Sequence, residues 1–65
     1  MKKYKLIDNH GQLYRIMGKK SDLSKLKIGD PIEACNIKYN CISYFDVYDI
    51  KDNGKIYIKH WSKEL

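Results

Sequence analysis

The sequence predicts a mainly β protein, a single small domain over residues 1–65, with five antiparallel strands on a curved sheet or small barrel. Two stretches rich in β-branched and aromatic residues each fold back on themselves around a glycine-containing turn. Between them, Gly29 and Pro31 stop any helix longer than a short turn near residues 21–26. We therefore expect two hairpins joined by one further strand.

The second hairpin contains the strongest turn signal of the chain, an Asn-Gly pair between strands near 42–50 and 55–61. A two-residue loop would place charged residues within the apolar face of the hairpin. A three-residue loop with Gly54 in the left-handed conformation pairs Ile50 with Ile56 and Tyr48 with Ile58, which gives one apolar face. We predict this second register.

The reverse face of that hairpin is only half polar. The predicted register gives it the pairs Phe45–Trp61, Val47–Lys59 and Asp49–Tyr57. Large aromatic side chains on both faces are typical of a strongly curved sheet with a thin core, and also of a sheet with a binding face. The sequence leaves both interpretations open.

The first hairpin is predicted from strands near 3–8 and 12–17, with Gly11 in the left-handed conformation. One face is then apolar, formed by Tyr4, Leu6, Tyr14 and Ile16. The opposite face places Lys5 across from Arg15. Like charges directly opposite each other are mildly destabilising, so this face is expected to be solvated or to meet an anion.

The connection between the hairpins predicts one helical turn capped by Ser21 and a strand near 31–35 that begins at Pro31, where no ladder donor is lost. The seven residues 26–32, Leu-Lys-Ile-Gly-Asp-Pro-Ile, are similar to the L-x-x-G-D-x-V pattern of many small SH3-like β-barrels. The resemblance implies an SH3-like barrel and assigns no functional residue.

Composition limits the classes of function. A chain of 65 residues has a small core, so its free energy of unfolding leaves a margin of only a few kcal/mol. No apolar run is long enough for a transmembrane helix, and Met1-Lys2-Lys3 precedes no signal-peptide core, so we expect a cytoplasmic protein without membrane contact. The net charge is +5, with +6 on residues 1–28 and −1 on residues 29–65. The basic half and the aromatic half are therefore different halves.

Candidate catalytic and metal-binding residues are few. Cys35 and Cys41 have neither redox-motif nor zinc-knuckle spacing, and we expect two buried, reduced thiols. His10 and His60 are the only histidines, and their positions suggest neither a nucleophile pair nor a zinc site. We predict no enzyme activity, no cofactor and no metal.

The first functional hypothesis is a nucleic-acid-binding module. Small curved sheets bind nucleic acid by combining basic grooves with stacking aromatic side chains. Tyr57 and Trp61 would provide the stacking. The phosphate contacts would come from the basic residues Lys3, Lys5, Arg15, Lys19, Lys20, Lys25 and Lys27.

The alternative is a phage or mobile-element protein that inhibits or modulates a host protein, itself acidic or nucleic-acid-binding. It would bind through the aromatic residues of its C-terminal hairpin, Phe45, Tyr57 and Trp61, because aromatic residues dominate binding hot spots. The oligomeric state is open, including a dimer. Tyr57 and Trp61 sharing a face with Lys3, Lys5 and Arg15 would favour nucleic acid, and a separate exposed aromatic patch would favour a protein partner.

Overall fold

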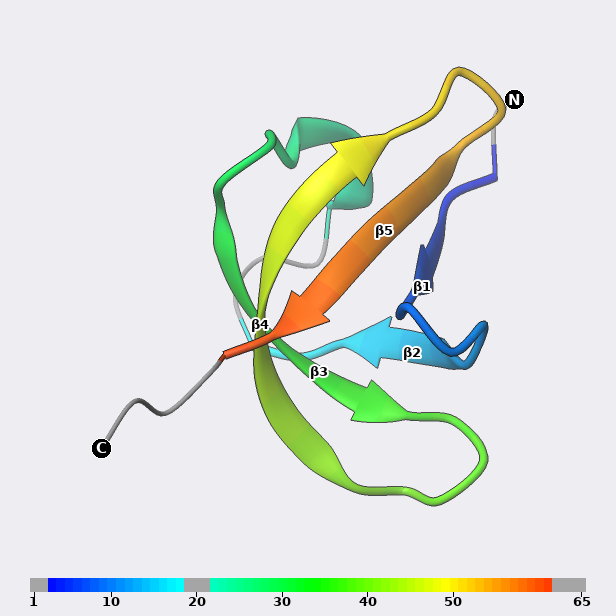
Figure 1. Cartoon of the computed structure of the whole chain (residues 1–65), viewed down its shortest axis with the longest axis vertical. Helices are drawn as coiled ribbons and strands as arrows, with labels where there is room; N and C mark the ends of the chain where they lie inside the picture. The colour runs from blue at the N-terminus through cyan, green and yellow to red at the C-terminus, as the bar shows by residue number, and fades with distance from the viewer. Residues whose placement is uncertain (1–2, 19–21, 62–65) are drawn as a thin grey trace.

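Five β-strands close into a barrel in the computed structural model, which describes residues 3–18 and 22–61 (Figure 1). The strands are β1 (Lys5–Ile7), β2 (Leu13–Ile16), β3 (Pro31–Asn36), β4 (Ile42–Ile50) and β5 (Lys55–His60). The single turn of 3-10 helix, η1 (Leu23–Lys25), falls within the predicted segment. The predicted mainly β class and all five strands are confirmed.

Both hairpins turn at the predicted glycines. Gly11 has a φ of 81° and Gly54 a φ of 91°, the left-handed region that glycine adopts at little cost. In the first hairpin, the ladder pairs Leu6 with Tyr14. In the second hairpin, Ile50 pairs with Ile56, as the predicted register requires. Turn chemistry therefore fixes the register beside both loops.

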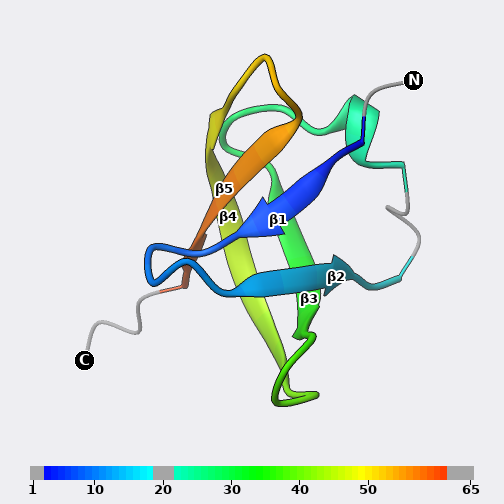
Figure 2. The same cartoon turned by 90° about the vertical axis from the view of Figure 1, so that its right-hand side faces the viewer.

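The barrel closes through a parallel pairing of β1 with β5, in which Lys5, Leu6 and Ile7 lie beside Lys55, Ile56 and Tyr57. Figure 2 shows β1 between β2 and β5. Only antiparallel strands were predicted, because hairpin signals indicate pairing only between strands that are consecutive in the sequence. The first and last strands run in the same direction, so the sheet is mixed.

A β-bulge at Tyr48 corrects the predicted register of β4. Ile50 pairs with Ile56 and Asp49 with Tyr57, but Val47 then pairs with Ile58, where Tyr48 was predicted. The bulge reverses the alternation of the strand, so residues on both sides of it point into the barrel.

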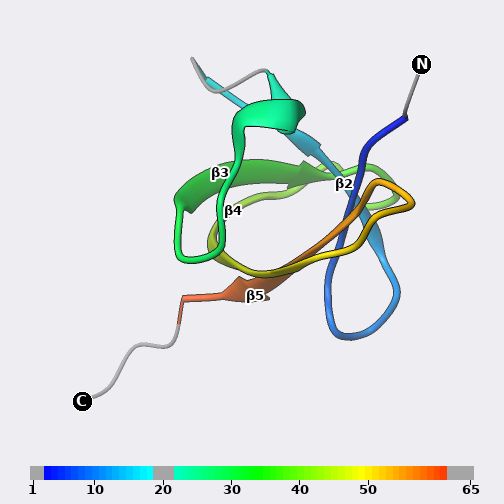
Figure 3. The ribbon, with the colours of Figure 1, turned by 90° about the horizontal axis from the view of Figure 1, so that it is seen from above.

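The core follows from that bulge. Phe45 and Val47, predicted on the half-polar reverse face, are buried together with Ile56 and Ile58. The remaining core residues are Leu6, Tyr14, Leu26, Ile32 and Ala34. Seen from above, the strands surround this interior (Figure 3).

The segment after β2 covers part of the core. Leu26 is buried, and Leu23 of η1 packs against the cluster. Asp22 caps η1 through its carboxylate, which accepts a hydrogen bond from the Ser24 backbone N–H at 3.1 Å. The predicted cap, Ser21, lies outside the described residues. Within those residues, no helix has the length and apolar character needed to cross a membrane.

Candidate nucleic-acid interface

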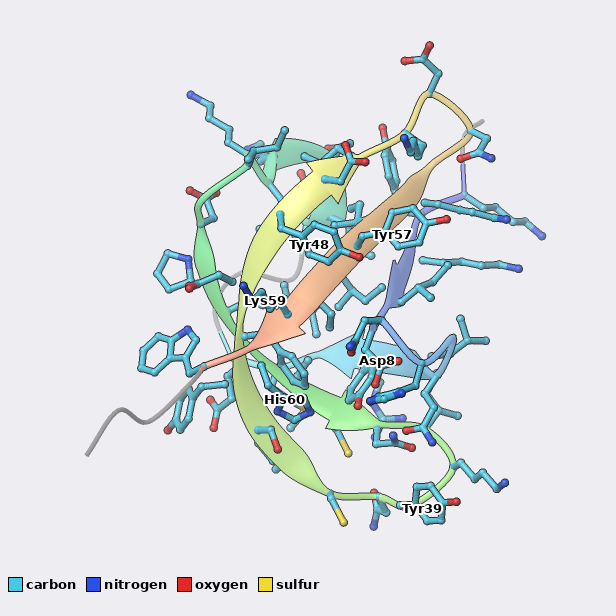
Figure 4. The ribbon with its side chains drawn as sticks, viewed as in Figure 1. Asp8, Tyr39, Tyr48, Tyr57, Lys59 and His60 are labelled. Atoms are coloured by element: carbon cyan, nitrogen blue, oxygen red, sulfur yellow. The ribbon has the colours of Figure 1, made fainter. Side chains whose placement is uncertain are left out.

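The outer side of β5 carries an alternating row of basic and aromatic residues. Ile56 and Ile58 are fully buried, so Lys55, Tyr57 and Lys59 between and beside them point outward. Figure 4 shows Tyr57 and Lys59 over the outer side of the sheet. β5 thus packs its two isoleucines into the core and presents a lysine, a tyrosine and a lysine on its outer side.

The parallel closure of the barrel adds a further cation to this row. The register places Lys5 of β1 directly beside Lys55, and both side chains are exposed. Like charges at adjacent positions of neighbouring strands are destabilising. Among residues 3–18 and 22–61, no carboxylate forms an ion pair with Lys5 or Lys55. A bound anion would relieve this repulsion.

A second tyrosine lies beside the row. The ring centroids of Tyr48 and Tyr57 are 6.1 Å apart, with 49° between their planes. Tyr48 is the bulged residue of β4 and is 45% exposed. We name this surface, formed by Lys5, Lys55, Tyr57, Lys59 and Tyr48, the Tyr57 face. Figure 4 labels Tyr48, Tyr57 and Lys59.

Acidic residues reduce the positive charge of the Tyr57 face without cancelling it. Asp49 forms an ion pair with Lys51 at 3.0 Å. The hydrogen bond and then the charge of Asp49 raise the pKa of Lys51, so this pair stays charged at neutral pH. Asp46 lies beside Lys59 in the ladder and accepts a hydrogen bond from Trp61 Nε1 at 2.9 Å. The three lysines of the face against Asp46 leave a net charge of +2.

The predicted basic residues do not all gather on one surface. Lys5 belongs to the Tyr57 face, and the exposed Lys3 lies just before β1. The β1–β2 ladder contains the pairs Leu6–Tyr14 and Ile7–Leu13, and Arg15 instead pairs with Cys35 of β3. The two strands diverge beyond these pairs (Figure 2), and their ladder does not include the predicted pairing of Lys5 with Arg15.

The remaining predicted cations lie away from the row. Lys25 is in η1, 4.0 Å from Asp22, and Lys27 is exposed in the following turn. Lys19 and Lys20 lie outside the described residues.

The three predicted aromatic residues separate into three environments. Tyr57 joins the basic row. Phe45 is 0% exposed, so its assignment to a partner-binding surface is wrong: the bulge turns it into the core, where its ring contacts Tyr14. Trp61 stacks on Tyr44, with centroids 5.3 Å apart. It is the next outward position of the strand after Lys59, about 7 Å from that lysine and about 20 Å from Lys55.

Sequence reasoning missed Lys55, Lys59 and Tyr48. The alternation Lys-Ile-Tyr-Ile-Lys over residues 55–59 was visible, and with both isoleucines assigned to the core it would have shown two lysines flanking Tyr57. The exposure of Tyr48 had no such signal, because it depends on the bulge.

Both cysteines are free thiols. Cys35 is buried as expected, but the expectation for Cys41 is wrong, since it lies exposed just before β4. Cys35 faces the outer side of β3, and its Sγ lies 3.4 Å from Asn40 Oδ1. In the described part of the chain, no group of three or more His, Cys, Asp or Glu side chains could hold a metal ion. The absence of enzyme activity stays a prediction.

Comparison with protein-family models, curated proteins and solved structures finds no match to this chain.

Proposed function

We propose that this protein binds single-stranded nucleic acid through its Tyr57 face. The observation that carries the proposal is the row on β5, in which Tyr57 lies between Lys55 and Lys59 with Lys5 beside the first lysine. Proteins that bind single strands combine a basic track for the backbone with aromatic side chains on which bases stack.

The division of labour follows from the chemistry of these side chains. Lysine binds phosphate as a point charge, so Lys5, Lys55 and Lys59 would position the backbone. Base stacking on an aromatic ring is worth about 1–3 kcal/mol per base and needs an unpaired base. Tyr57 and Tyr48 offer two rings 6.1 Å apart for that purpose. This arrangement favours single strands over duplex and gives little sequence preference.

The charge of the face sets the strength of binding. A net charge of +2 supports only a few phosphate contacts, so we expect a dissociation constant of about 1–100 μM, as for non-specific binding at physiological salt. Three phosphate contacts predict a slope of log affinity against log salt near −2, at about −0.7 per contact on a single strand.

The test is a fluorescence-anisotropy titration of a labelled single-stranded oligonucleotide and its duplex, between about 50 mM and about 200 mM salt. Lys5→Glu and Lys55→Glu should each weaken binding and make the salt slope shallower by about 0.7. Tyr57→Ser should weaken binding at an unchanged slope, because stacking releases no counterions.

The matched control is Lys38→Glu, which makes the same charge change beside Tyr39. Figure 4 places Tyr39 at the far end of the barrel from Tyr57, and the Lys38 Nζ lies 5.3 Å from the centroid of the Tyr39 ring. Equal losses from Lys38→Glu and Lys55→Glu would mean that net charge alone drives binding. No binding at low salt would reject the proposal.

A further inference from the structure

A second surface, chemically unlike the Tyr57 face, lies across β3 and β4. A groove of about 350 Å³ runs from the end of β2 to the end of β5, between Met17 and Trp61. Pro31, Glu33 and Tyr44 are among the residues that line it. We name it the Trp61 groove.

The aromatic side of the Trp61 groove is held in place by three contacts. The Trp61 backbone N–H donates to the Tyr44 carbonyl at 3.1 Å, its ring stacks on that of Tyr44, and its indole N–H donates to Asp46 at 2.9 Å. Even so, Trp61 is 51% exposed and Tyr44 54% exposed. Because the indole N–H is already engaged, the pair offers a ligand its π surface.

Glu33 supplies the charge. It lies opposite Tyr44 in the β3–β4 ladder and is the one charged residue among the described residues that line the groove. In the described part of the chain, its carboxylate takes part in no hydrogen bond or ion pair, while its carbonyl accepts from the Met17 N–H at 2.8 Å. The backbone is fixed and the carboxylate stays available.

We propose that the Trp61 groove binds an arginine side chain of a partner polypeptide. A guanidinium is planar, stacks on aromatic faces and pairs with a carboxylate through two parallel hydrogen bonds. Its aliphatic stem would pack against Met17 and Pro31. A lysine ammonium would gain the charge interaction with Glu33 but not the stacking or the paired hydrogen bonds.

An arginine fits the groove because its positive charge complements Glu33, although the chain as a whole is basic. A protein with a net charge of +5 repels basic peptides in general. Binding of an arginine peptide therefore needs a local acidic and aromatic site, and Glu33 between Met17 and Tyr44 forms one. The Tyr57 face, with its unpaired lysines, would repel the same ligand, so the two surfaces select opposite charges.

Trp61 is the only tryptophan, so its fluorescence and its indole N–H resonance report on this groove directly. The probes are the peptides acetyl-Gly-Ala-Xaa-Ala-Gly-amide, with Xaa as arginine, lysine or the neutral arginine analogue citrulline. We expect saturable shifts of the Trp61 indole resonance with the arginine peptide, at a dissociation constant on the order of 1 mM. Citrulline should bind at least about fivefold more weakly, and lysine in between.

Glu33→Gln should weaken the arginine peptide by about fivefold or more and leave the citrulline peptide unchanged. Asp52→Asn, which removes the same charge from the exposed second turn, is the matched control and should leave both unchanged. Equal binding of the arginine and citrulline peptides, or an arginine affinity unaffected by Glu33→Gln, would overturn the proposal. Glu33→Gln changes no residue of the Tyr57 face, so oligonucleotide binding by this variant can succeed or fail independently.

Discussion

Asp8 secures the first loop with one side chain. Its Oδ1 accepts hydrogen bonds from the backbone N–H groups of His10 and Gln12, both at 2.9 Å, and its Oδ2 accepts from the Tyr14 hydroxyl at 2.9 Å. The residue is 3% exposed. Buried polar atoms with every partner in place specify one conformation, and here they join the loop to the core.

We predict that Asp8→Ala lowers the free energy of unfolding by about 2–3 kcal/mol, because it leaves three donors without this acceptor. Tyr14→Phe, which removes the hydroxyl that donates to Asp8, should cost about 1 kcal/mol. Urea unfolding followed by circular dichroism measures both. Equal costs for the two variants would show that the backbone contacts of Asp8 contribute nothing.

The same carboxylate predicts an acid dependence of stability. Burial raises the pKa of Asp8, but the hydrogen bonds from Gln12, Tyr14 and His10 together outweigh it, so the pKa lies below its ordinary value. The stabilisation from Asp8 is therefore complete above that ordinary value and is lost as the pH falls through the lowered one.

Asp8→Asn should consequently flatten the acid limb of the stability–pH curve, as measured by urea midpoints across the acid range. The exposed Asp52→Asn serves as the control and should leave the limb in place. An acid limb unchanged by Asp8→Asn would assign it to other carboxylates.

At the scale of the elements, the predicted register of each hairpin is right next to its loop and wrong farther along the strands. The glycine turns and the first cross-strand pairs were predictable, because a loop of given length fixes its own register. The bulge at Tyr48 was not, since a period-two pattern places Phe45 and Ile50 on opposite faces of a regular strand. Only the need to pack both against the core of a closed barrel selects the bulge.

Gly54 is the residue on which the second hairpin depends. It is buried, has a φ of 91°, and its N–H donates to the Lys51 carbonyl at 3.1 Å. Gly54→Val should lower the free energy of unfolding by about 1–2 kcal/mol, because a β-branched residue is strained in this region. Thermal unfolding measures the cost, with Asp52→Asn as a control at an exposed position of the same turn. A stability equal to that of the unmodified protein would refute the strain argument.

For the whole molecule, closure decides which surfaces exist. The parallel β1–β5 pairing brings Lys5 beside Lys55, from opposite ends of the sequence, and so assembles the Tyr57 face. Local patterns could predict the exposure of each lysine but not this contact. Likewise, Trp61 stacks on Tyr44 because the pairing of β5 with β4 continues as far as His60 and Phe45. The barrel thus places the Trp61 groove directly after the basic row of β5.

The two thiols give a readout of whole-barrel stability. Cys41 is exposed, whereas Cys35 is 3% exposed in a strand paired on both sides, with β2 and with β4. A thiol reagent should label Cys41 rapidly in the native state. Cys35 lies on the outer side of β3 with its Sγ against Asn40 of the following loop, so the reagent can reach it when that loop moves or when the barrel unfolds. If unfolding is the only route, Cys35 labelling in a domain stable by about 5 kcal/mol should be slower by about 10³- to 10⁴-fold.

The measurement is timed alkylation read by mass spectrometry, with Cys41→Ser and Cys35→Ser to isolate each thiol. If Cys35 is reached only by global unfolding, any core substitution that lowers the free energy of unfolding must accelerate its labelling by the factor that corresponds to that loss. Ile58→Ala, at a fully buried position of β5, should cost about 2–5 kcal/mol and remove most of that protection. Rapid labelling of Cys35 in the unmodified protein, with Ile58→Ala making no difference, would mean that movement of the loop after β3 exposes the thiol while the barrel stays closed.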